Sequence, residues 1–161
     1  MKTSWTTLPC AILSTALLLS GGPVSAGGNS PWSVALKHCI AAFEKLNPVD
    51  VSELSKVKAP DWAMVDQGDT FAVGPDVFMT VHGEINTELA SCTVASKGAE
   101  MDDSFESWAS EATDMGIYGP VDGEDLTHVE TIDWREPRMN IEVVSKGDVT
   151  WIKTYEVDKE A

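Results

Sequence analysis

The chain switches twice from helical to alternating hydrophobic spacing, and this pattern most constrains its fold. The first stripe of apolar residues at helical spacing consists of Trp32, Leu36, Cys39, Ile40 and Phe43. Ser30 as N-cap and Pro31 as first helical residue precede it, so we predict a helix over 31–46. Asp50 and Glu53 are spaced like a capping box and predict a short helix over 51–57, which ends before Pro60.

Short segments rich in β-forming residues follow this helical part. Turn sequences containing Gly, Pro, Asn or Asp separate them. The pattern predicts a meander of short strands with one buried face. The predicted strands span 62–65, 70–73, 77–83 and 88–95.

The second half repeats the order of helix and then strands. Asp103 and Glu106 are placed to open a helix that Gly116 ends. Its apolar stripe consists of Phe105, Trp108, Ala109, Ala112 and Met115. A Gly/Pro/Asp-rich loop over 118–125 follows, and three further strands are predicted over 126–134, 139–144 and 149–157.

This element order predicts the α+β class. We expect a two-layer fold in which an antiparallel β-sheet of five to seven strands carries two main helices packed on one face. The length remaining after residue 26 suffices for one hydrophobic core, so 27–161 is predicted to form a single domain.

Residues 1–26 have the composition of a cleaved signal peptide. Lys2 is followed by the apolar run 8–19, by the break Gly21-Gly22-Pro23, and by Val24-Ser25-Ala26 at the cut. The run is shorter than the roughly 20 apolar residues that span a bilayer, which argues against a membrane anchor. We therefore expect export to a periplasm or the extracellular medium. The lack of a usable Asn-x-Ser/Thr acceptor favours a bacterial source.

Two cysteines remain after such a cleavage, Cys39 and Cys92. An even pair in an exported chain predicts a disulfide between them. The alternative is a pair of free buried thiols, which behave as small hydrophobic side chains.

The chain is strongly acidic, with a formal net charge of −15. Nucleic-acid binding needs a basic face, so this charge argues against it. Solubility or adaptation to a salty medium explains the negative charge most simply. The more specific interpretation is that the charge binds a basic partner or a divalent cation. Asp122, Glu124 and Asp125 surround Gly123 and are a weak calcium candidate, with a solvated turn as the alternative.

No catalytic residue and no cofactor are assigned from the sequence. The histidines His38, His82 and His128 belong to no recognisable catalytic or metal motif. The most distinctive segment is Trp134–Arg138, in which Trp134, Arg135 and Arg138 are possible contacts for a ligand or partner. His82 and His128 are further candidates, and local acids are the alternative partners of both arginines.

Three functions remain open at this stage. The first is a non-enzymatic domain that binds an unknown protein or small ligand, and the second is a small secreted enzyme using a histidine–carboxylate pair in a cleft. The third is an acidic inhibitor or immunity-type protein for a basic partner. We expect a histidine, acids and a tryptophan to converge in one pocket if the protein is an enzyme.

Overall fold

The structure is a computed structural model that describes residues 30–63, 65, 67–87, 89–99, 104–123 and 125–157. The predicted signal peptide over 1–26 and its cleavage site lie outside these residues. Export and the domain boundary at residue 27 therefore stay predictions.

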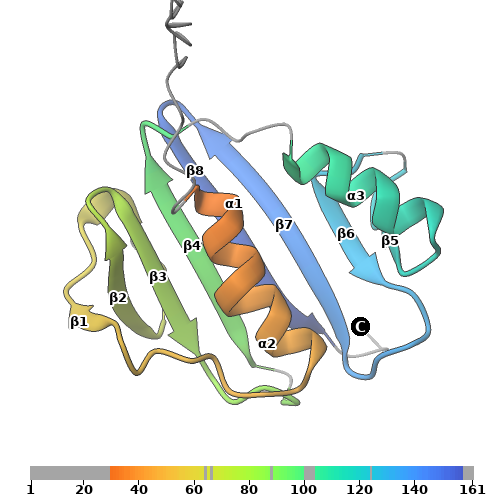
Figure 1. Ribbon diagram of the computed structural model, residues 1–161, viewed down its shortest axis with the longest axis horizontal. Coiled ribbons are helices and arrows are strands. Elements are labelled where there is room, and N and C mark those ends of the chain that lie inside the picture. The colour runs from red at the N-terminus through yellow and green to blue at the C-terminus, as the bar shows by residue number, and fades with distance from the viewer. Residues whose placement is uncertain are drawn as a thin grey trace, which may run out of the picture.

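The core of the fold is one antiparallel sheet of eight strands in the order β1-β2-β3-β4-β8-β7-β6-β5 (Figure 1). The strands are β1 (Ser55–Val57), β2 (Asp69–Gly74), β3 (Val77–His82), β4 (Ser91–Lys97), β5 (Tyr118–Pro120), β6 (His128–Thr131), β7 (Arg138–Lys146) and β8 (Val149–Val157). The α+β class with an antiparallel sheet is confirmed, but the predicted limit of seven strands and the predicted number of two main helices are wrong. The additional strands are short edge strands, which leave little alternating pattern in the sequence.

The first predicted helix is present as three consecutive helical segments. They are α1 (Pro31–Val34), the π-helical segment η1 (Ala35–Ile40) and α2 (Ala41–Glu44). Ser30 caps the start, since its hydroxyl oxygen accepts a hydrogen bond from the Ser33 amide at 3.1 Å. This run of helical segments ends before Leu46, whose φ of 53° lies outside the right-handed helical region.

The second helix is α3 (Ser104–Asp114), and it lies over the same face of the sheet as the first (Figure 1). Trp32 joins the two helices, because its ring lies 4.9 Å from the Phe105 ring and 5.1 Å from the Trp108 ring. Both helices and the inward residues of the strands share one hydrophobic core. The opposite face of the sheet carries no α-helix of the described chain.

Three local predictions are wrong. The segment 51–57 forms a turn and strand β1 instead of a helix, because Ser55–Val57 pairs with β2, and the Asp50 carboxylate accepts from the amide and hydroxyl of Ser52 within the turn. The strand predicted over 62–65 is wrong at its start, where a 3₁₀ helix, η2 (Asp61–Ala63), is found instead. Its Trp62 packs on Phe78. The predicted loop 118–125 contains β5, which gains its order by pairing with β6.

The predicted disulfide between Cys39 and Cys92 is confirmed. Their Cα atoms are 5.5 Å apart, and both side chains are completely buried. The bond links η1 to β4, and so it attaches the helical layer to the centre of the sheet.

Candidate functional site

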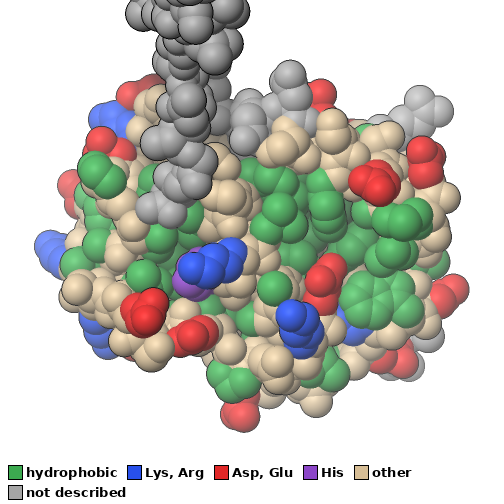
Figure 2. Space-filling model, viewed as in Figure 1, with side chains coloured by type: hydrophobic (Ala, Val, Ile, Leu, Met, Phe, Trp, Pro, Cys, Tyr) green, Lys and Arg blue, Asp and Glu red, His purple; other side chains and the backbone are tan. Residues whose placement is uncertain are grey.

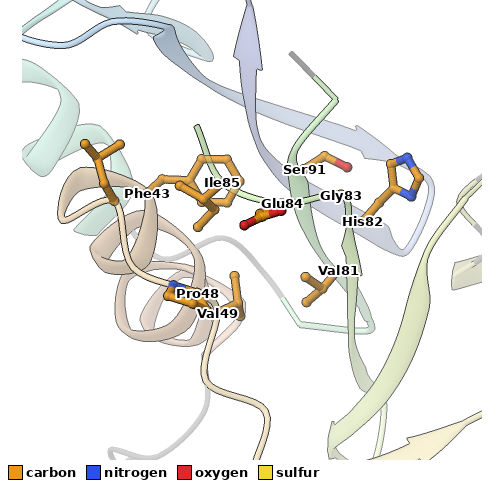
Figure 3. Close-up of a pocket in the computed structure, with 10 residues that line it drawn as sticks. Phe43, Pro48, Val49, Val81, His82, Gly83, Glu84, Ile85 and Ser91 are labelled. Carbon is orange, nitrogen blue, oxygen red and sulfur yellow. The ribbon is translucent and has the colours of Figure 1, made fainter. Parts of the chain in front are cut away.

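The ends of β3 and β4 enclose an apolar cavity of about 290 Å³. Phe43, Val49, Val81 and Ile85 surround a common space, in which Glu84 also lies (Figure 3). The other lining residues are Leu46, Pro48, His82, Gly83 and Ser91. The cavity therefore has mostly hydrophobic walls and one carboxylate, that of Glu84.

The loop that forms one wall of this cavity is tightly constrained. Gly83 has a φ of +70°, and a Cβ at this position would meet the Leu89 carbonyl oxygen at 2.7 Å, so only glycine fits. Farther along the loop, the amides of Asn86 and Thr87 donate to the Glu156 carboxylate at 2.8–3.0 Å. This wall is thus attached to strand β8.

Arg135 holds Glu156 from the other side. Its guanidinium donates to Glu156 and to the Pro137 carbonyl, and its Nε donates to the Phe43 carbonyl at 3.0 Å. The side chain is only 3% exposed, and that of Glu156 is not exposed at all. The structure therefore pairs Arg135 with an acid and leaves its side chain unable to touch a ligand. Through these hydrogen bonds, Arg135 instead helps to position the cavity wall at Phe43 and the wall formed by the loop.

A second cavity, of about 560 Å³, lies on the helix-free face of the sheet. It is a mixed polar and apolar groove lined by Val65, Gln67, His82, Ser91, Thr93, Glu142, Val144, Trp151 and Lys153. His82 and Ser91 line both cavities and are register partners at the ends of β3 and β4. The apolar cavity and the groove therefore meet around the end of the sheet.

His82 is the most available polar group at this junction. In the described part of the chain it has no hydrogen-bond or ion-pair partner, and its side chain is half-buried. A half-buried imidazole without a protein partner can donate to or accept from a ligand.

The charged groups of the groove are not paired with each other. Glu142 stands opposite Lys153 in the register of β7 and β8, yet among the described residues no ion pair joins them. The Lys153 ammonium lies 4.4 Å from the centre of the Tyr155 ring instead. Burial, and then the charge of Glu142, raise the pKa of Tyr155, so its phenol stays neutral.

The groove brings His82 together with a carboxylate and a tryptophan, as expected for the enzyme hypothesis. However, His82 lies on β3 and Glu142 on β7, with β4 and β8 between them. Three strand spacings separate their backbones by roughly 14 Å, which is too far for direct proton transfer. This pair therefore does not have the geometry of a general acid–base couple.

His128 lies in a polar cluster that borders the groove, because it is the register partner of Glu142 in the pairing of β6 with β7. Its Nε2 is 3.0 Å from the Asn140 amide oxygen and 3.1 Å from the Tyr155 hydroxyl, and its Nδ1 is 3.9 Å from the Asp122 carboxylate. The structure thus brings His128 near an acid, although the Asp122 side chain is 87% exposed.

The remaining predicted contacts lie apart from these cavities. Arg138 donates to Glu130 at 3.0 Å, so it also has a local acid as its partner. Trp134 is 44% exposed, and its indole N–H donates to the Ile117 carbonyl at 2.7 Å.

The calcium candidate is described only in part, because Glu124 lies outside the described residues. Asp125 accepts from the amide and hydroxyl of Thr127, and these hydrogen bonds lower the pKa of its carboxyl group. Its oxygens are thus used within a turn, which is the alternative that the sequence left open. Within the described ranges, no group of three or more His, Cys, Asp or Glu side chains is placed to hold a metal ion.

Sequence reasoning missed Glu156 and Lys153. The alternation of strand β8 could have identified Glu156, because Glu156 lies on the same buried face of this strand as Ile152 and Thr154. An acid at such a position needs a buried partner, and this requirement predicts an ion pair.

No helix of the described chain is both long and apolar enough to cross a membrane.

Comparisons with known proteins identify no similar protein. No family model matches the sequence, and searches of curated proteins and of solved structures find no match either.

Proposed function

We propose that this protein is a non-enzymatic exported binding protein that holds a small amphipathic ligand around His82. The observation that supports the proposal best is the meeting of an apolar cavity and a polar groove at one half-buried, unpartnered histidine. Concave sites with apolar walls and few polar groups are the usual form of small-ligand sites.

The two cavities differ in the chemistry that they accept. The apolar cavity between Phe43, Val49 and Ile85 suits a short hydrocarbon chain or ring. The groove offers Trp151 as an apolar surface and Ser91, Thr93 and Gln67 as hydrogen-bonding groups. A ligand with an apolar tail and a polar head would therefore use both.

Electrostatics limits the charge of the head group. Lys153 and Glu142 both line the groove, and the chain as a whole carries a net charge of −15. A multiply charged anion would be repelled, whereas a neutral, zwitterionic or singly charged head is compatible with the pair.

The proposal can be tested with octyl glucoside and octanoate as probes. Binding would be measured by NMR titration of the purified protein, following the amides of the 81–85 segment and the His82 ring. We expect both probes to shift these signals. Val49→Trp, which fills the apolar cavity, should weaken binding at least about tenfold.

The matched control is Leu89→Lys, because Leu89 is 72% exposed and lines neither cavity. This variant should bind as the unmodified protein does. The proposal is wrong if neither probe shifts the 81–85 signals, or if Val49→Trp and the control bind equally well.

A second candidate is the small secreted enzyme, which the chain Tyr155–His128–Asp122 favours. The raised pKa of Tyr155 opposes its use as a base, since the phenol stays protonated. Hydrolysis of chromogenic esters or glycosides that His128→Ala abolishes and Leu89→Lys preserves would support this candidate. Activity equal in both variants would point to a contaminant.

A further inference from the structure

A second surface, independent of the His82 site, exposes apolar side chains beside the edge strand β5. Ile117, Ile132 and Trp134 are 36%, 41% and 44% exposed and line one shallow hollow of about 610 Å³. Gly116, Glu44 and Asp133 complete it, and Met115, which is 59% exposed, is the neighbour of Gly116. Several large apolar residues exposed at one place on a small protein are typical of an interaction surface.

The hollow is held in shape by its own hydrogen bonds. The Ile117 carbonyl accepts from the Trp134 indole at 2.7 Å and from the Ile132 amide at 3.0 Å. The Trp134 ring also stands edge-on to the buried Tyr118 ring at 6.1 Å. A partner would therefore meet an ordered surface, which reduces the entropy lost on binding.

Acids outnumber basic residues in the segments that form this hollow, where the exposed Lys45 next to Glu44 is the nearest lysine in the sequence. No lysine or arginine occurs between Lys97 and Arg135, and Arg135 itself is buried. Glu44 and Asp133 line the hollow, and the Tyr118 hydroxyl donates to the Glu44 carboxylate at 2.8 Å. Figure 2 shows apolar side chains between the first helix and α3, with acidic side chains along the margin beside α3 and one basic side chain near the lower end of the first helix.

We propose that the hollow at Ile117, Ile132 and Trp134 docks a basic partner protein, which inserts an apolar side chain flanked by lysines or arginines. The apolar floor supplies contact area, and the acidic margin supplies complementary charge. A second copy of this chain fits less well, because a two-fold contact would place the same acids against each other. An anionic membrane or a nucleic acid would be repelled for the same reason.

The test uses the full-length exported protein and two fluorescently labelled peptides, one alternating Leu and Lys and one alternating Leu and Glu. Binding would be followed by fluorescence anisotropy at several salt concentrations. We expect the Lys peptide to bind, its affinity to fall steeply with salt, and the Glu peptide not to bind. Ile132→Lys should weaken binding of the Lys peptide at least about tenfold.

Leu89→Lys again serves as the matched control, because it adds the same charge at an exposed apolar residue outside the hollow. Asp133→Asn is a second variant that should weaken binding without unfolding, since asparagine tolerates the φ of 48° at this position. Equal losses in Ile132→Lys and Leu89→Lys would mean nonspecific charge attraction and would overturn the proposal. Self-association of the protein that Ile132→Lys abolishes would overturn it as well. Neither result bears on the His82 site, whose probes are uncharged or anionic.

Discussion

At the scale of single residues, Arg135 and Glu156 join segments that are far apart in the sequence. Glu156 receives the amides of the loop beyond Gly83, and Arg135 binds the end of the first helix and the Pro137 carbonyl. A buried ion pair gains little over apolar packing when it is complete, but loss of one partner leaves a buried charge. This asymmetry makes the pair a sensitive test of the structure.

Glu156→Leu should therefore lower the free energy of unfolding by about 3–5 kcal/mol, because the buried guanidinium of Arg135 and two loop amides lose their acceptor. Denaturant unfolding followed by tryptophan fluorescence would measure the change. The double variant Arg135→Met with Glu156→Gln should lose less than the sum of its single variants, since no unpaired charge remains. Strict additivity would contradict the direct pairing of the two side chains.

At the scale of elements, β4 is the strand on which the two layers depend. It pairs with β3 and β8 at the middle of the sheet, and Cys92 within it bonds to Cys39 of the π-helical segment. Its residues Cys92 to Ser96 are all buried. A covalent link at this point limits how far the helix can separate from the sheet.

Replacing both cysteines by alanine should lower stability by about 2–5 kcal/mol, since the bond closes a loop with a sequence separation of 53. Thermal or denaturant unfolding of the double variant would measure this loss. In the native protein the bond is completely buried, so a hydrophilic reductant should act slowly until denaturant is added. Rapid alkylation of both cysteines under native conditions after mild reduction would contradict the buried position.

At the scale of the whole molecule, the chain folds as two similar arrangements that the sequence does not show as a repeat. Each consists of a helical part followed by four antiparallel strands, and the last strand of each, β4 and β8, pairs at the centre of the sheet. The exposed acids surround this structure, while its two tyrosines are partly or fully buried. Their titration therefore reports on the integrity of the entire fold.

Burial raises the pKa of Tyr118, with the charge of Glu44 and the hydrogen bond to it as further causes, and burial also raises the pKa of Tyr155. In the unfolded chain both should ionise near the ordinary value of 10.0. The folded state keeps these protons longer, so this contribution to stability is present below pH 10 and is lost as the pH rises above it.

A titration of tyrosinate absorbance should accordingly show little ionisation at pH 10 in the folded protein and normal ionisation in denaturant. The free energy of unfolding should fall with increasing pH above 10. Two tyrosines that titrate normally in the folded protein would contradict their described surroundings.

The sequence by itself determined the class of fold, the main helical and strand segments and the disulfide, because these depend on local spacing and on the number of cysteines. The strand over 149–157 was predicted with its observed bounds, since its alternation continues along the whole strand. Only the tertiary structure decided that Arg135 is a buried partner of Glu156, that Ser55–Val57 is a strand, and that His82 joins two cavities. Each of these depends on which distant segments meet, and the spacing of residues along one segment contains no information about its partners.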